Sequence, residues 1–252
     1  MRIMNYKLRI TIFTLLLGVF CSCNNDLAPE CFTARGDDVT YITDVEAFSS
    51  IHISPGIELV IKQGPEQKVT IATGENIKQY LSAEVKNGEL WLENANNCNW
   101  VHTYKTTTVY VTTPNLERIY SASQFAVKSD GVLAFPNLSL QSGIFSETAS
   151  GTFELNVDCT NLTVEDNQSA YYVITGSVEN LAVQFYSGDA RFDGRNLEVQ
   201  NLQVFHRSSN DIIAKVQQQV TGTLYSTGNL VLKNHPPVVE VERLYNGRVV
   251  YD

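Results

Sequence analysis

Lysine and arginine are scarce relative to acidic residues in this sequence. The 252 residues include 18 Lys and Arg against 27 Asp and Glu, which gives a formal net charge of −9. Binding to a phosphate backbone requires a surplus of basic residues on one face of a protein, so this balance argues against nucleic acid as a partner. With 43% hydrophobic and 18% charged residues, the chain suffices for one sizeable domain or two small ones sharing a core.

The sequence also lacks the short motifs that mark common catalytic and cofactor sites. It contains no Gly-x-Ser-x-Gly elbow, no His-Glu-x-x-His pair, no phosphate loop and no dinucleotide fingerprint. It has no pair of CxxC motifs, and its four histidines are dispersed along the chain: His52, His102, His206 and His235. We therefore expect no metal site, no cofactor and no enzymatic activity.

Long apolar runs are absent too. The run near the start, residues 10–20, is shorter than the roughly 20 residues that a membrane-spanning helix needs, and basic residues precede it. This pattern predicts a secretory signal peptide over residues 1–22. The run closes on Phe20-Cys21-Ser22-Cys23, which resembles a bacterial lipobox in which Cys23 carries the lipid. The alternative is an ordinary signal peptide with an incidental cysteine.

Polar residues follow Cys23 and form a predicted tether over residues 23–40. Asn24, rather than Asp, stands directly after the cysteine, which resembles lipoproteins that are released to the outer membrane. We therefore predict an outer-membrane lipoprotein, periplasmic or surface-exposed, whose contact with the membrane is its lipid anchor.

The remaining cysteines are few and odd in number. With Cys21 assigned to the signal peptide and Cys23 to the lipid, Cys31, Cys98 and Cys159 remain. Cys31 lies in the tether, and Cys98 lies in an Asn-rich loop of the same N-terminal half, whereas Cys159 stands far along the chain. We therefore predict a disulfide between Cys31 and Cys98 that fixes the N-terminal segment to the body of the protein.

Residues 41–114 show the period of two that is typical of strands. Apolar and polar residues alternate at Ile51, Ile53, Ile57, Leu59 and Ile61, with Pro55-Gly56 as an irregularity between the two runs. Asn87-Gly88 further along is the strongest short signal for a hairpin, because both residues tolerate a positive φ. This half is predicted to form an antiparallel β layer.

Residues 115–235 instead show a repeat. Asn-Leu pairs begin at positions 115, 137, 161, 180, 201 and 229, so the successive spacings are 22, 24, 19, 21 and 28 residues. An aliphatic residue and then a polar turn follow most of the pairs. Short strands at such a period predict a β-helix or related solenoid, in which each Leu points inward and each Asn hydrogen-bonds at a corner. The alternative is a β-sandwich with coincidental spacing.

The end of the chain departs from the repeat. Pro236-Pro237 interrupts it, and residues 238–251 are predicted to form a hairpin around Asn246-Gly247. A capping hairpin over residues 236–252 would cover the open end of the solenoid. The predicted fold is therefore all-β: a β-helix or solenoid with an antiparallel N-terminal layer and a C-terminal β-hairpin cap.

Several segments of the chain resemble the head GIN domain family of auto-transporter adhesins, common in Bacteroidota lipoproteins. The likeness is carried by Phe48-Ser49-Ser50-Ile51-His52-Ile53, by residues 56–64 (GIELVIKQG), by residues 84–90 (EVKNGEL) and by residues 109–116 (VYVTTPNL). It covers roughly residues 39–228. The resemblance implies a β-helix-like fold, a cell-surface location and a role in adhesion, and it brings no catalytic residues.

Aligning the coils on their Asn-Leu pairs gives one candidate binding site. Phe185 and His206 stand five places after their Asn, and Tyr186 and Arg207 stand six places after it. Adjacent coils would place Tyr186 and Arg207 about 4.8 Å apart at the backbone. An aromatic ring beside hydrogen-bonding groups suits a sugar ring or a peptide edge. The alternative is a ladder of side chains that packs only on itself.

Two tryptophans near the Asn-rich loop give a second candidate. Trp91 and Trp100, with Tyr104 close by, could form a binding platform. Alternatively, they pack under the loop.

Two classes of function remain open at this point. The preferred one is a non-enzymatic surface lipoprotein that acts as an adhesin-like or structural interaction module, with a glycan or a surface protein as its partner. The alternative is a glycan-binding accessory or polysaccharide-acting β-helix enzyme that uses the face around Asp189, Arg191 and Arg207. For these charged residues, a surface ladder of salt bridges is the simpler interpretation.

Overall fold

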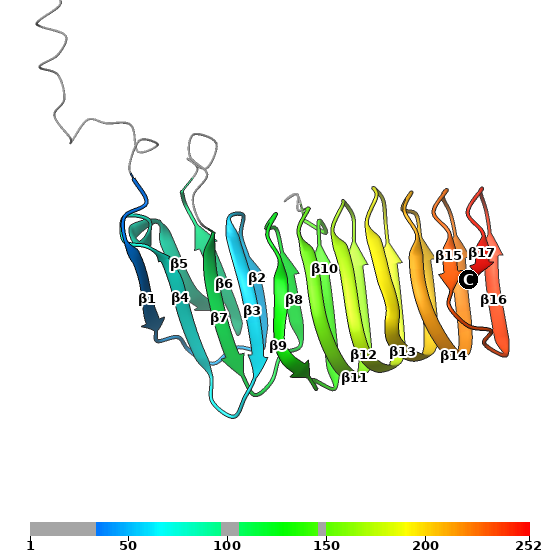
Figure 1. Ribbon diagram of the computed structural model, residues 1–252, viewed down its shortest axis with the longest axis horizontal. Coiled ribbons are helices and arrows are strands. Elements are labelled where there is room, and N and C mark those ends of the chain that lie inside the picture. The colour runs from blue at the N-terminus through cyan, green and yellow to red at the C-terminus, as the bar shows by residue number, and fades with distance from the viewer. Residues whose placement is uncertain (1–33, 97–105, 146–149) are drawn as a thin grey trace, which may run out of the picture.

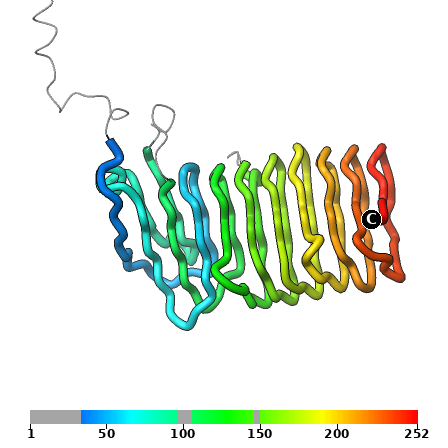
Figure 2. The backbone as a smooth tube through the Cα atoms, in the orientation of Figure 1, coloured from blue at the N-terminus to red at the C-terminus, as the bar shows by residue number. Residues whose placement is uncertain are grey.

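The computed structural model describes residues 34–96, 106–145 and 150–252, and shows a flattened β-solenoid whose coils stack from one end to the other (Figure 1, Figure 2). Each central coil is one long strand that bends midway. In β11 (Thr152–Asp166), buried and open residues alternate up to Cys159, two exposed residues follow at the bend, and the alternation resumes at Leu162. The period of two therefore continues on both sides of a corner, and each strand contributes to two sheets.

The first sheet contains the segments that come before the bend. Its order is β1 (Asp38–Thr43), β4 (Lys68–Gly74), β7 (Thr107–Thr113), β3 (Ile57–Gln63), β9 (Val127–Leu133), then the first halves of β11, β12 (Tyr171–Phe185), β13 (Arg191–His206) and β14 (Ile212–Leu224), and finally β15 (Leu230–Leu232) and β17 (Val249–Tyr251).

The second sheet contains the segments that come after the bend. Its order is β5 (Leu81–Lys86), β6 (Glu89–Asn94), β2 (Ser50–Ile53), β8 (Arg118–Ser121), β10 (Asn137–Ser142), then the second halves of β11 to β14, and finally β16 (Val238–Arg243). A short 3-10 helix, η3 (Lys78–Tyr80), precedes β5. Because the long strands run through both sheets, the described strands form one continuous mixed sheet.

The core is the narrow space between the two sheets, and it is filled by stacked rows of side chains. Leu138, Leu162, Leu181 and Leu202 pair in register on successive coils, and each is at most 2% exposed. Rings fill the same space nearer the turns, where Phe153 and Tyr172 stack with their ring centroids 4.8 Å apart. The predicted solenoid with an inward row of leucines is therefore confirmed.

The N-terminal half differs from the predicted antiparallel layer in its pairing. Only β1, β4 and β7, and the pair β5 and β6, run antiparallel, whereas β2 and β3 pair in parallel with their neighbours on both sides. The reason lies at Pro55-Gly56. Gly56 has φ +87°, and its turn carries the chain from the second sheet to the first, so β2 and β3 already form one coil of the solenoid.

The C-terminal segment also differs from the prediction, because it forms a further coil rather than a hairpin. β16 pairs in parallel with β14, and β17 pairs in parallel with β15. The turn at Gly247 is held by its backbone N–H, which donates to the carbonyl of Ser226 one coil earlier at 2.9 Å. This arrangement lets Val239, Val241 and Val249 pack against the core. A hairpin directed away from it would leave them in water.

The last Asn-Leu pair does not occupy the predicted corner. Leu230 pairs with Ile212 in the first sheet, and Gln219-Val220 takes the corner position beside Asn201-Leu202. Within the described ranges, no helix is long and apolar enough to cross a membrane.

Candidate binding face

A ladder of asparagines runs along the bend of the solenoid. The side-chain amide of Asn161 donates to Asn137 Oδ1 at 2.7 Å, that of Asn180 to Asn161 Oδ1 at 3.1 Å, and that of Asn201 to Asn180 Oδ1 at 3.1 Å. Each side chain thus fixes the next, as the repeat predicted. The ladder presents ordered amide groups at one border of the second sheet.

A shallow groove of about 410 Å³ lies beside this ladder on the outer face of the second sheet. Its lining is mostly amide and hydroxyl groups: Asn161, Thr163, Asn180, Asn201, Gln203, Gln219 and Thr221, with Leu162, Leu181, Leu202 and Ala182. Ala182 pairs with Thr163 on one side and Gln203 on the other. The groove exists because this short side chain leaves a gap between two longer neighbours.

The adjacent row of the same face is polar at its centre. Gln141, Glu165, Gln184 and Phe205 lie side by side on successive coils. The Gln141 amide donates to Glu165 Oε2 at 2.6 Å. The hydroxyl of Tyr186 donates to Glu165 Oε1 at 2.9 Å and lies 2.6 Å from Gln184 Oε1. Burial and the bond to Glu165 raise the pKa of Tyr186 to about 12, so its hydroxyl remains protonated and its ring is held in place.

Three aromatic rings form a row at the end of these strands. The ring centroids of Tyr186 and Phe205 lie 5.6 Å apart, and those of Phe205 and Tyr225 lie 4.7 Å apart. Tyr225 is 38% exposed. Arg207 is exposed, and its backbone N–H donates to the Phe185 carbonyl at 2.8 Å. Arg207 therefore lies one coil from Tyr186, as its position in the repeat predicted.

Phe185 and His206 do not belong to this outward-facing row, in contrast to the prediction. Both are fully buried in the core, with their ring centroids 5.9 Å apart. Alternation explains the placement, since Leu181 and Val183 point inward and Phe185 has the same parity. Phe205 takes the outward-facing place instead and is half-buried there, and its parity relative to Leu202 is the signal that could have identified it. Burial lowers the pKa of His206 to about 4.

Trp91 belongs to a different stack on the outer face of the second sheet. It lies against His52 with ring centroids 3.9 Å apart, and His52 lies 4.7 Å from Tyr120. Lys86 Nζ lies 5.7 Å from the centroid of the Trp91 ring. Trp91 is half-buried by these contacts, which fits the alternative that it packs within the structure. Trp100 lies outside the described residues.

Of the cysteines discussed above, the structure describes only Cys159. Cys23, Cys31 and Cys98 lie outside the described residues. Cys159 is a buried free thiol near the bend, and burial, with the charge of Asp158 beside it, raises its pKa to about 11. Its thiolate form, which would be the nucleophile, is therefore suppressed at neutral pH.

The charged residues of the alternative site are divided between the two sheets. Arg191 opens β13 in the first sheet and lies over the Tyr171 ring, with its guanidinium carbon 5.1 Å from the centroid. Arg207 instead follows the end of β13 in the second sheet, and Asp189 is exposed in the turn that precedes β13. The structure therefore places Arg191 on a strand of the first sheet, apart from Asp189 and Arg207, which lie in successive turns.

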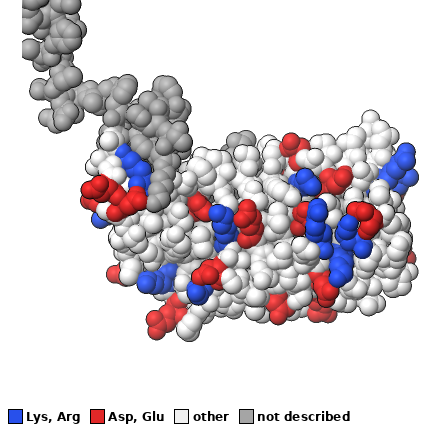
Figure 3. Space-filling view, viewed as in Figure 1, with Lys and Arg blue, Asp and Glu red and all other residues white. Residues whose placement is uncertain are grey.

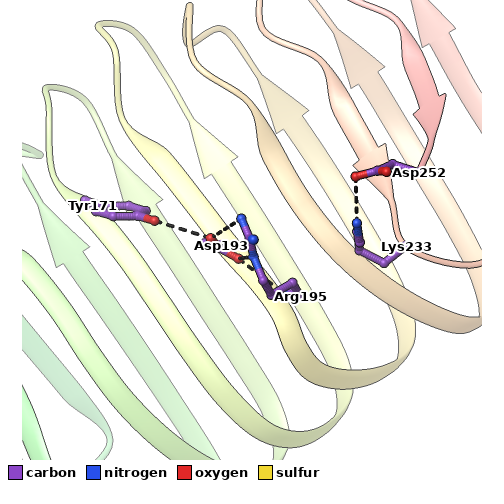
Figure 4. Close-up of polar contacts among 5 residues, drawn as sticks. All are labelled: Tyr171, Asp193, Arg195, Lys233 and Asp252. Carbon is purple, nitrogen blue, oxygen red and sulfur yellow. Dashed lines mark hydrogen bonds and ion pairs between the residues drawn. The ribbon is translucent and has the colours of Figure 1, made fainter.

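Acidic and basic side chains gather on the face of the molecule that Figure 3 shows, and Figure 4 shows Asp193 of the first sheet between Tyr171 and Arg195. Arg195 donates to it through Nε at 2.8 Å, its Nη2 lies 2.8 Å from the second carboxylate oxygen, and the Tyr171 hydroxyl donates at 3.3 Å. Burial acts to raise the pKa of Asp193, but these bonds and the charge of Arg195 hold it below its usual value. At neutral pH this carboxylate is therefore ionised and paired with Arg195. In the part of the chain that the structure describes, no group of three or more His, Cys, Asp or Glu could hold a metal ion.

The profile of one protein family, described as "Putative auto-transporter adhesin, head GIN domain", matches residues 47–236. No curated protein matches the chain. The fold is similar to a crystal structure titled a putative adhesin from Bacteroides fragilis, with a TM-score of 0.77 and 17% identity over 86% of this chain and 97% of that one. It is also similar to a putative adhesin from Parabacteroides distasonis (TM-score 0.62, 14% identity, 86% and 98% covered). A putative lipid binding protein from the same species is similar too (TM-score 0.62, 12% identity, 85% and 97% covered).

Proposed function

We propose that this chain, which belongs to the head GIN domain family of auto-transporter adhesins, is a non-enzymatic binding module held at the outer membrane by a lipid on Cys23. The observation that supports it best is the outer face of the second sheet, where an ordered amide groove lies beside a row of aromatic rings. Such a broad, open face suits adhesion to an extended partner, whereas an enzyme needs a cleft with convergent reactive groups.

Two described carboxylates, Asp193 and Asp166, are unsuited to acid–base catalysis. A general acid needs a raised pKa and access to its substrate. Asp193 is ion-paired with a lowered pKa. Burial raises the pKa of Asp166 to about 6, but Asp166 is fully buried and accepts a hydrogen bond from the Tyr172 hydroxyl at 2.9 Å. We therefore expect no release of reducing ends when the protein is incubated with polysaccharides.

Membrane fractionation tests the anchor. The short apolar run that ends at Cys23 supports attachment by acyl chains rather than by a spanning helix. Replacement of Cys23 by Ala should move the protein from the membrane fraction to the soluble fraction, while Cys21→Ala should leave it in the membrane. A Cys23→Ala protein that stays with membranes after a high-salt wash would show that the lipid assignment is wrong.

The proposed disulfide between Cys31 and Cys98 would tie the tether to the folded body near β6. Peptide mapping under non-reducing conditions should recover the two cysteines in one linked peptide. Recovery of both as free thiols from protein isolated under oxidising conditions would refute the pairing.

A further inference from the structure

We propose that the outer face of the second sheet, between β11 and β14, binds an uncharged oligosaccharide that lies along the solenoid axis. This inference rests on the proposed function as a binding module and names the class of its ligand. The face consists of the groove centred on Ala182 and of the aromatic row Tyr186, Phe205 and Tyr225.

The aromatic row has the chemistry that recognises the flat side of a sugar ring. Its rings come from successive coils, with centroids 5.6 Å and 4.7 Å apart and planes tilted by 48° and 41°, so they adjoin one another across the strands. Aromatic rings offer an apolar surface to the C–H face of a sugar, and a tyrosine adds a hydroxyl that can hydrogen-bond. Tyr186 is already fixed by its bond to Glu165 at 2.9 Å, so little ordering is needed when a ligand binds.

The groove supplies hydrogen-bonding groups that repeat at the same interval. Thr163, Gln203 and Thr221 are brought to one line across the coils by the strand register, with Ala182 as the gap. Adjacent strands are about 4.8 Å apart, so a polymer lying across them meets a similar polar group at each step. The asparagine ladder holds one border of this groove in a single arrangement. A repeating chain rich in hydroxyls satisfies such a surface.

The charge on and around the face favours an uncharged polymer. Glu165 lies in the row of Phe205, and Glu240 and Glu242 continue the two rows on β16. Arg207 is exposed after the end of β13, and Arg243 pairs with Leu224 at the end of β16. Carboxylates along both rows would repel a polyuronate or a sulfated glycan, and the face offers no cluster of Lys and Arg to an anionic lipid headgroup.

A peptide strand is disfavoured for a different reason. Peptides often bind by adding a strand to an open edge of a sheet. Here the second halves of β11 to β14 are paired on both sides, from β10 to β16. Their backbone groups are therefore occupied, and binding on this face must use side chains.

Affinity electrophoresis of the purified chain tests the inference, with gels that contain a neutral polysaccharide (glucomannan, xylan or hydroxyethylcellulose) or polygalacturonate. At least one neutral polymer should retard the protein, and polygalacturonate should not. The double variant Phe205→Ala/Tyr225→Ala should weaken the retardation at least about tenfold, a loss that stacked rings commonly explain. Tyr110→Ala, which removes a 47% exposed tyrosine from the first sheet, is the matched control and should bind normally.

A second variant tests the groove, and its thermal unfolding shows whether it is folded. Ala182→Phe should fill the gap between Thr163 and Gln203 and weaken binding, while thermal unfolding of the protein remains cooperative.

The inference is overturned if no neutral polymer retards the protein, if only polygalacturonate does, or if the double variant binds like Tyr110→Ala. Membrane attachment through Cys23 and adhesion of cells to protein-coated surfaces are separate measurements. If those persist when polysaccharide binding fails, the module assignment stands and only the ligand class is wrong.

Discussion

Leu181 lies in the middle of the inward leucine row and is the residue that best reports on the packing of the coils. It pairs with Leu162 on one side and Leu202 on the other and is 2% exposed. Truncation to Ala should leave a cavity with neighbours on both sides and lower the free energy of unfolding by about 2–5 kcal/mol. Urea unfolding measures the loss, which is a large share of the ~5–15 kcal/mol of a typical domain.

Arg191 provides the matched control on the outward side of β13 in the first sheet. It is exposed and its guanidinium lies over the Tyr171 ring, so Arg191→Ala should cost less than about 1 kcal/mol. A mild Leu181→Ala together with a severe Arg191→Ala would mean that the inward and outward faces have been exchanged.

His206 makes the stability of the protein depend on pH. Burial lowers its pKa from 6.5 to about 4 in the folded state. Between these values the unfolded chain binds more protons than the folded one, so the free energy of unfolding falls as pH drops from about 6.5 towards 4 and is level above that range. Asp166 acts in the opposite sense, because burial raises its pKa to about 6 and its protonation favours the folded state.

The contribution of His206 is isolated by replacing it with Leu, which occupies the paired position one coil later as Leu224. Between pH 7.5 and pH 4.5, His206→Leu should lose less stability than the wild-type protein, by a difference on the order of 2–3 kcal/mol. Urea titrations at the two pH values give the comparison. Equal losses in both proteins would show that His206 is not held neutral by burial.

At the scale of the strand, Gly222 shows how closely the coils approach. It has φ +129°, and a Cβ at this position would lie 1.9 Å from the Val204 carbonyl oxygen of the neighbouring coil. Gly222→Ala should therefore destabilise the protein by several kcal/mol, through backbone strain of about 1–3 kcal/mol together with displacement of β14 from β13.

Gly88 is the control that isolates the cost of placing Ala at a positive φ from the cost of a steric clash. It also has a positive φ, +77°, but a Cβ there would meet nothing within 4 Å. Gly88→Ala should cost only about 1 kcal/mol. If thermal unfolding shows that Gly222→Ala and Gly88→Ala cause the same small loss of stability, the coils at Gly222 are further apart than in this structure.

The elements of the central coils were predictable because their sequence repeats. Asn161-Leu162, Asn180-Leu181 and Asn201-Leu202 recur at spacings of 19 and 21 residues, and the recurrence of the pair indicated the corner and the inward row. The direction of pairing in the N-terminal half was not predictable, because alternation is the same in parallel and antiparallel strands. Pro55-Gly56 is a turn in either case, and contacts distant in the sequence decide which strand lies beside β3.

The candidate site was predicted only in part. The prediction misassigned which residues of the strands point outward, and it could not foresee the effect of one small side chain. Tyr186 and Arg207 were placed correctly on adjacent coils, but Phe185 and His206 were assigned outward when their spacing from Leu181 and Leu202 directs them inward. The groove had no sequence signal, because a single Ala182 is unremarkable until its neighbours are known. Sequence motifs identify residues with distinctive chemistry, whereas this groove depends on a small side chain between two larger ones on neighbouring coils.

For the molecule as a whole, stacking in register turns single side chains into long rows. The coils follow one another from β1 at one end to β16 and β17 at the other (Figure 1). Each coil contacts only its neighbours, as in other solenoids, so positions that are equivalent in the repeat become lines along the axis. The asparagine ladder and the groove row through Ala182 are two such lines on one sheet, and the rings of Tyr186, Phe205 and Tyr225 lie next to them on successive coils. A rigid face with parallel lines of this kind is suited to an extended ligand.

The most direct test of a surface-anchored binding module uses cells that display the full chain. These cells are washed over a surface coated with the neutral polysaccharide that retards the purified protein, and the number of cells retained is measured. Cells displaying the wild-type chain or Tyr110→Ala should be retained under washing. Cells displaying Phe205→Ala/Tyr225→Ala at the same surface density should be released. Equal retention of all three would contradict the assignment of binding to the outer face of the second sheet.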